Sequence, residues 1–199
     1  MADEMMDKDP ASTQMVSAEA GVAPADVRAA HDMAAFVQEC PSMFHTVAAM
    51  RRRLDEAGFA YLPESKPWEF RRGGRYYTVR NNSSIIAFKV GAKLDAYRFQ
   101  LTASHSDSPT YKVKAAPELS GSAGYLRLNV EAYGGVMDHT WLDRPLSVAG
   151  RVLVRSGNRV ESRLIAPDAD LLIIPRVPIH LDREANSRFS PNRAVDLCP

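Results

Sequence analysis

The sequence predicts a mixed fold, in which an α/β half up to about residue 108 is followed by a β-rich half. Three observations carry this prediction. Two segments with helical periodicity come first, alternating segments follow from about residue 75, and no convincing helix pattern interrupts the strands after Tyr111. At 199 residues the chain is long enough for one or two domains.

The two helices are predicted from apolar residues that recur at spacings of three and four. The first helix starts near Pro24 and stops at Pro41, and the second starts after Ser42, which is expected to cap it, and ends at Gly58. Strands are predicted at 75–79, 84–88, 99–103, 111–114, 125–131, 146–155, 159–165 and 171–174.

Composition excludes several classes of protein. The chain has 25 Lys and Arg against 24 Asp and Glu, so the basic face of a nucleic-acid or membrane-surface protein is not expected. No apolar run approaches the ~18 residues of a membrane span. Residues 1–23 are predicted to be a disordered tail that lacks a secretory signal. Two distant cysteines, Cys40 and Cys198, indicate reduced thiols in a cytoplasmic protein.

The most informative stretch for chemistry is 101–109, where a predicted strand delivers His105 and Asp107. Positions i and i+2 of an extended backbone project to the same side, so the two side chains are expected to stand together at a strand end. Such a pair can bind a metal, because the carboxylate holds one ring nitrogen and leaves the other to ligate the ion. A polar cluster on a surface loop remains the alternative, whereas a triad with Ser104 is disfavoured because adjacent residues face opposite sides.

Two further stretches draw attention. Residues 130–152 contain a Gly-Gly turn, a Trp and an Asp-Arg pair between strands, which is typical of a structured loop. His180 lies between apolar neighbours, and a histidine in that setting is more often structural than functional.

Together these stretches resemble the N-terminal part of the aspartyl aminopeptidase family, cytosolic metallopeptidases with two zinc ions per active site. The resemblance runs from about Phe36 to Asn192, and its short motifs are collinear with the family. The matching segments are Pro41–His45, Ala57–Phe59, Gly74–Asn81, Ser83–Phe88, His105–Pro109, Tyr133–Gly135, Thr140–Ser147 and Ile179–Leu181, closed by Asn186.

The resemblance implies a fold and a set of roles. Residues 24–108 would be the N-terminal part of a three-layer α/β zinc-peptidase catalytic domain, and residues 109–199 an incomplete β-rich inserted domain that forms dimers or larger homo-oligomers. His105 would ligate zinc, and Asp107 would be the catalytic carboxylate behind it. His180 would reach a neighbouring subunit's active site to bind substrate, which reverses the structural interpretation of that histidine.

The implied function is a zinc metalloaminopeptidase that releases acidic N-terminal residues, Asp or Glu, from peptides. The family's other metal ligands and its general base have no match in this chain, so we expect a truncated chain that is inactive alone. We also expect poor solubility or a loosely packed, associating species, because apolar strand faces such as 85–88 and 99–103 would be left uncovered. One alternative is a non-catalytic truncated product that retains only a subunit-association module, and another is a different metallohydrolase with the same α/β layout.

Overall fold

The computed structural model describes residues 23–93, 95, 98–121 and 124–199. The predicted tail of residues 1–23 therefore lies outside the described residues, except for Ala23. The chain divides into two units, one ending at Cys40 and the other spanning Pro41–Pro199, and each is described by itself. The division predicted at residue 108 stays a prediction.

The first unit contains helix α2, Pro24–Glu39, where the sequence predicted it. Pro24 occupies the first turn, where its missing N–H costs no hydrogen bond, and the helix ends before Pro41. None of the α2 residues is buried, and the apolar side chains of Met33 and Val37 are exposed.

The second unit opens with helix α3, Met43–Glu56, which also matches the prediction. Ser42 stands at the N-cap with extended backbone, but its side chain does not cap the helix as expected. Its Oγ instead lies 2.7 Å from Nδ1 of His45. The helix ends before Gly58, whose φ of 75° is the left-handed conformation that glycine adopts without strain.

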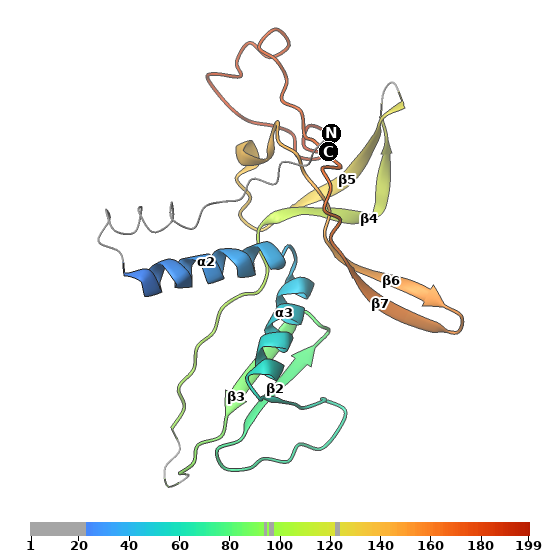
Figure 1. Ribbon diagram of the computed structural model, residues 1–199. Helices are drawn as coiled ribbons and strands as arrows, with labels where there is room; N and C mark the ends of the chain where they lie inside the picture. Colours follow the sequence, from blue (N-terminus) through green and yellow to red (C-terminus); the bar gives the residue numbers. More distant parts are fainter. Residues whose placement is uncertain (1–22, 94, 96–97, 122–123) are drawn as a thin grey trace, which may run out of the picture. The chain divides into compact units, whose positions relative to one another are not determined.

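A three-stranded sheet with the order β1-β2-β3 follows α3 in the chain, and Figure 1 shows its strands β2 and β3 side by side. β1 (Ala60–Tyr61) pairs parallel with β2 (Arg75–Arg80), and β2 pairs antiparallel with β3 (Ser84–Lys89). The β2–β3 connection places Asn81 and Asn82 at φ 52° and 53°, a conformation that asparagine tolerates better than most residues.

The core of this region forms between α3 and β2. Val47 of α3 and Tyr77 of β2 are 0% and 1% exposed, and they cluster with Val79. The hydroxyl of Tyr77 donates a 2.7 Å hydrogen bond to Oδ1 of Asp55, which ties the strand to the helix. The predicted helix and strand are thus both present, and side chains of α3 and β2 pack against each other to form this core.

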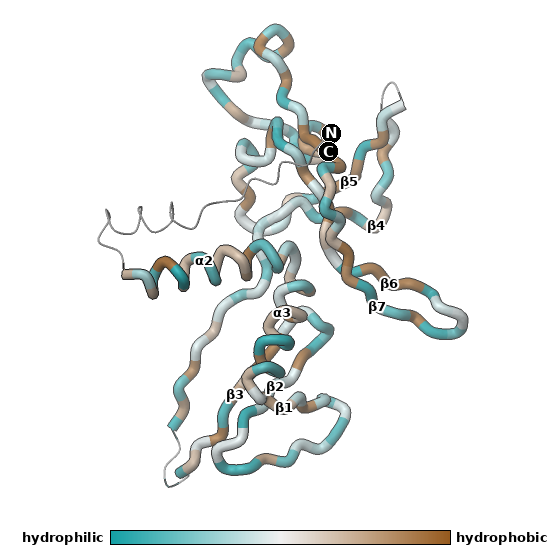
Figure 2. The backbone as a smooth tube through the Cα atoms, in the orientation of Figure 1, coloured by the Kyte–Doolittle hydropathy of each residue, from teal (hydrophilic) through white to brown (hydrophobic). Residues whose placement is uncertain are grey.

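Among the described residues of the β-rich half, the named strands form two antiparallel hairpins. β4 (Thr110–Ser120) pairs with β5 (Leu126–Tyr133), with an irregularity in register between Val113 and Glu118. β6 (Gly150–Ser156) pairs with β7 (Arg159–Ile165), and hydrophobic residues lie along both strands (Figure 2). β6 begins four residues later than the predicted start at residue 146.

The segments around these hairpins are held by a few backbone contacts. Leu142 and Leu146 form isolated bridges with Ile174 and Leu172, so the strand predicted at 171–174 is reduced to two bridges. Ile174 is fully buried. The short helix η2, Asp138–Trp141, precedes this region.

The prediction of a strand at 99–103 is wrong, because residues 98–109 carry no regular secondary structure. Phe99 and Leu101 are 84% and 87% exposed, so no described part of the chain covers these two apolar side chains. A strand requires hydrogen-bonding neighbours, and no described strand pairs with this segment. Among the described residues, no helix is long and apolar enough to cross a membrane.

Candidate metal centre and comparisons

His105 and Asp107 lie in contact, as the sequence predicted, although they do not stand at the end of a strand of their own, because residues 98–109 carry no regular secondary structure. Nδ1 of His105 is 2.7 Å from the backbone oxygen of Asp107 and 3.1 Å from its Oδ1. Both oxygens can only accept, which assigns the proton of His105 to Nδ1. The contact that was predicted between residues i and i+2 is therefore present, although the strand that was expected to bring them together is not.

Asp107 is also held from the other side by Tyr133, the last residue of β5. The Tyr133 hydroxyl donates a short hydrogen bond to Oδ2 of Asp107. This bond is the largest cause that holds the pKa of the Asp107 carboxyl below its usual value, and it raises the pKa of Tyr133. Sequence reasoning gave Tyr133 no role, because only the register of β4 and β5 shows that it faces Asp107.

Two backbone features place Tyr133 beside the His105 segment. Tyr133 pairs with Thr110, the first residue of β4, so the end of β5 lies opposite the chain that follows Asp107. Gly134 then turns with φ 75°, and a Cβ at this position would lie 3.5 Å from Cα of Pro109. Nearby, the Ser106 hydroxyl donates to the backbone oxygen of Ser83 at 3.2 Å, which links the segment to the β2–β3 turn.

The pair fits one part of a zinc site. With Nδ1 occupied by Asp107, the remaining nitrogen of His105 is Nε2, and the His105 side chain is 79% exposed. A neutral imidazole held by a carboxylate in this way is a common zinc ligand. A zinc ion needs three or more protein ligands, and no group of three His, Cys, Asp or Glu side chains converges among the described residues.

His180 lies elsewhere, in an exposed turn after the Pro-rich segment 175–178. Within the described part of the chain, no hydrogen bond or ion pair joins it to His105 or Asp107. The structure therefore brings together two of the three predicted site residues. An exposed position agrees with a residue that acts outside its own subunit, but the role itself stays a prediction.

A second polar cluster, which was not predicted from the sequence, is centred on Asp138. The hydroxyl of Tyr111 donates to Oδ1 of Asp138 at 2.5 Å, and Nε of Arg193 donates to Oδ2 at 2.9 Å. Burial opposes ionisation of Asp138, but these two hydrogen bonds, together with the attraction of the Arg193 and His139 charges, hold the pKa of its carboxyl below the usual value. Burial and the Asp138 carboxylate raise the pKa of Tyr111. We assign this cluster a structural part, because it ties β4, η2 and the C-terminal segment together.

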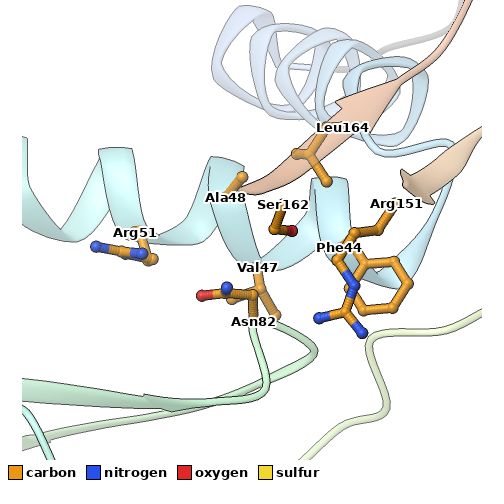
Figure 3. Close-up of a pocket in the computed structure, with 8 residues that line it drawn as sticks. All are labelled: Phe44, Val47, Ala48, Arg51, Asn82, Arg151, Ser162 and Leu164. Atoms are coloured by element: carbon orange, nitrogen blue, oxygen red, sulfur yellow. The ribbon is translucent and has the colours of Figure 1, made fainter. Parts of the chain in front are cut away.

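One small pocket lies beside α3 and has a volume of about 140 Å³ (Figure 3). Arg151 of β6 lies over the ring of Phe44, 4.3 Å from its centroid, and donates to the backbone oxygen of Asn81 at 2.9 Å. The pocket is lined by Phe44, Val47, Ala48, Arg51, Asn82, Arg151, Ser162 and Leu164. None of the three predicted site residues lines it, so this pocket is separate from the candidate metal centre.

The chain is similar to known peptidases over most of its length. Residues 36–199 match the family model described as aminopeptidase I zinc metalloprotease (M18). A probable M18 family aminopeptidase 2 of Clostridium acetobutylicum is 41% identical over 167 residues, which are 82% of this chain and 39% of that protein. The corresponding protein of Ectopseudomonas mendocina is 44% identical over 165 residues, covering 82% and 38%. The chain therefore spans about two fifths of the length of these relatives.

Solved structures agree with the sequence matches and confirm the predicted fold class. The cryo-EM structure of the Ape4 and Nbr1 complex aligns with a TM-score of 0.81 at 41% identity, over 85% of this chain and 33% of that one. The S. cerevisiae mApe1 dodecamer aligns with a TM-score of 0.64 at 30% identity, over 74% and 35%. The resemblance that the sequence motifs indicated is confirmed: the chain belongs to the M18 family of zinc metallopeptidases.

Proposed function

We propose that this chain supplies part of the active site of a zinc metalloaminopeptidase that releases acidic N-terminal residues, Asp or Glu, from peptides. One observation carries the proposal. Within the stretch that matches the family, Nδ1 of His105 contacts Asp107, and Nε2 is thereby set up as a metal ligand. We further propose a cytoplasmic enzyme, in line with a sequence that has only two cysteines, far apart in the chain.

Each residue of the centre has a distinct task in this proposal. His105 holds one of two zinc ions through Nε2, and Asp107 keeps the ring in the tautomer that leaves Nε2 unprotonated. Tyr133 fixes the Asp107 carboxylate by its hydrogen bond and so limits rotation of the pair. The bound ions would polarise the scissile carbonyl and activate the attacking water. Among the residues described, no third His, Cys, Asp or Glu side chain converges with this pair to form a group of three possible ligands.

The third task falls to His180, and it involves a second subunit. We propose that the protein forms a homo-oligomer through its β-rich half and that His180 enters the neighbouring subunit's site to bind the peptide. Two features support this. His180 is exposed on a turn, and one of the structurally similar proteins, mApe1, is described as a dodecamer.

A hybrid enzyme tests the proposal. In it, residues 36–199 of this chain replace the matching region of the Clostridium acetobutylicum relative, so that the rest of that relative can supply the missing ligands. We expect zinc-dependent cleavage of aspartyl-p-nitroanilide, slower cleavage of the leucyl compound, and none of the N-acetylated aspartyl compound. His105→Ala should abolish activity, and Asp107→Asn should lower it about 10–100-fold.

His31 offers a matched control, because it lies in α2 outside the family match. His31→Ala is made in a second hybrid that also carries residues 23–35 of this chain, and there it should leave activity and zinc content unaltered. Full activity in the His105→Ala hybrid would overturn the proposed metal ligand. Equal cleavage of aspartyl and leucyl substrates would overturn the acidic preference alone.

A second candidate function is a subunit-association module without catalysis. It is favoured by the lack of three converging ligands among the described residues, and by the exposed apolar side chains of Leu153 and Val160 on the β6–β7 hairpin. The isolated chain discriminates between the two. Near-stoichiometric zinc and cleavage of aspartyl-p-nitroanilide by this chain alone would reject the association-only function.

A further inference from the structure

The segment that leads to His180 is tied at its start to Asp143. The Asp143 carboxylate accepts the backbone N–H of Arg176 at 2.8 Å through Oδ1, and its Oδ2 lies 3.8 Å from the Arg176 guanidinium. The backbone N–H of Asp143 donates to the carbonyl of Ile174 at 3.0 Å. A single residue therefore contacts the chain on both sides of Pro175.

Asp143 makes these contacts from an unusual backbone conformation. Its φ is 53°, in the left-handed region that only glycine, asparagine and aspartate visit readily. The conformation is supported by Leu142, which bridges Ile174, and Ile174 is fully buried. Asp143 thus joins a fixed point of the core to the start of the exposed segment.

Few rotations remain between this fixed point and His180. Pro175 and Pro178 each have a restricted φ, and proline also restricts the residue before it to extended conformations. The carbonyl of Pro178 then accepts the N–H groups of Leu181 at 2.8 Å and Asp182 at 3.1 Å, which closes a turn around His180. The position of the segment at Arg176 is therefore transmitted to the turn.

We propose that Asp143 is a positioning residue for His180, which it holds in place through the Arg176 backbone and the proline-restricted segment that follows. The functional importance of this device rests on the proposed role of His180 in substrate binding. Asp143 itself touches no substrate in this arrangement. Its contribution is to keep the turn in one place, so that less ordering is required when a peptide binds.

Amide hydrogen exchange of the whole chain tests the proposal without requiring catalysis. Asp143→Gly removes the carboxylate while tolerating the left-handed φ, and Asp143→Asn keeps an acceptor for the Arg176 N–H. In Asp143→Gly we expect exchange about fivefold or more faster at Arg176 and also at Leu181 and Asp182. Asp143→Asn should exchange like the parent chain at all three amides.

Several outcomes would overturn the proposal. Faster exchange at Arg176 with parent-like exchange at Leu181 and Asp182 would show that the contact is local and is not transmitted. Faster exchange in Asp143→Asn than in the parent chain would show that an oxygen acceptor for the Arg176 N–H is not enough to hold the segment. Acceleration of the same size in Asp168→Ala, a change at an exposed aspartate after β7, would show a non-specific effect.

Two further measurements keep the test decisive. Amide exchange in α3 reports whether Asp143→Gly remains folded. If this variant does not fold, Pro178→Ala is used in its place. Pro178→Ala should accelerate amide exchange at Leu181 and Asp182 but not at Arg176. Failure of Pro178→Ala to do so would overturn the proposal. In the hybrid enzyme, His180→Ala should raise KM. An unchanged KM in this variant would contradict the proposed role of His180 in substrate binding. The exchange measurements test the positioning role of Asp143 independently of that result.

Discussion

The region around β2 and the segment 98–109 show what an alternating apolar pattern does and does not determine. Tyr77 and Val79 in β2, and Phe99 and Leu101 in the segment 98–109, are large apolar residues two positions apart. Tyr77 in β2 is 1% exposed and belongs to a core with Val47, whereas Phe99 is 84% exposed and belongs to none. Only the first region has regular secondary structure.

The difference teaches that the pattern specifies which side chains require burial, and that the strand itself requires a neighbour. β2 has β1 on one edge and β3 on the other, and α3 contributes the apolar side chains that cover Tyr77. Residues 98–109 have none of these partners among the described residues. The His105–Asp107 contact is nevertheless present in this open segment, because the two residues are close in sequence and Tyr133 also holds the Asp107 carboxylate.

The largest expected effect separates these two regions by stability. Tyr77→Ala would leave a cavity beside Val47 and remove the hydrogen bond to Asp55, and it should lower the free energy of unfolding by about 3–5 kcal/mol. Phe99→Ala is the matched control and should change it by less than about 0.5 kcal/mol. Urea unfolding followed by circular dichroism measures both. Equal effects would contradict the distinction between a closed core and an open segment.

The next effect concerns association. Phe99 and Leu101 are exposed apolar side chains, and burying such a side chain contributes about 1.5–3 kcal/mol. Replacing both with lysine should weaken self-association of the chain about 100-fold or more, as measured by sedimentation. Thr102→Lys/Ser104→Lys adds the same charge to the same segment without removing apolar surface, and it should have much less effect. Equal weakening by the two double variants would show that charge, and not apolar contact, controls association.

Much of the fold could be predicted, because it is determined by local signals. The Pro24 start and Gly58 stop of the helices, and the strands at β2 and β3, depend on residues next to each other in sequence. The prediction of a strand at 99–103 was wrong for the opposite reason. A strand needs a partner strand to pair with, and the periodic pattern of a segment does not show whether such a partner is present. The cap expected from Ser42 failed because His45 competes for its hydroxyl.

The candidate site divides in the same way. The His105–Asp107 contact was predictable because only one residue separates the two in the sequence. Tyr133 and Asp143 were not, because each acts on a residue 26 or 33 positions away. Only the register of β4 with β5, and the bridge between Leu142 and Ile174, bring these pairs together.

A pH-dependent effect tests the cluster that closes the β-rich half. The folded pKa of Asp138 is lowered, so its contribution to stability is present above the unfolded value of 3.8 and is lost as pH falls through the folded pKa. Asp138→Asn keeps an acceptor for Tyr111 but loses the charge that faces Arg193, and it should cost about 1 kcal/mol at pH 7. The urea midpoint of the variant should lie below that of the parent at pH 7, and this difference should shrink when both are measured at pH 3. A constant difference across this range would show that Asp138 does not stabilise the cluster through its ionised form.

The smallest expected effect lies in the open segment. Tyr133→Phe removes the hydrogen bond to Asp107 but leaves the His105–Asp107 contact, and exposed hydrogen bonds add little to global stability. We therefore expect a urea midpoint close to that of the parent chain, together with a clear loss of order in the Asp107 side chain, measured by its carboxyl 13C relaxation. Tyr125→Phe, at an exposed tyrosine before β5, is the matched control and should alter neither property. Unchanged relaxation in Tyr133→Phe would mean that the local contact with His105 is enough to orient Asp107, and the long-range contact would then contribute nothing to the centre.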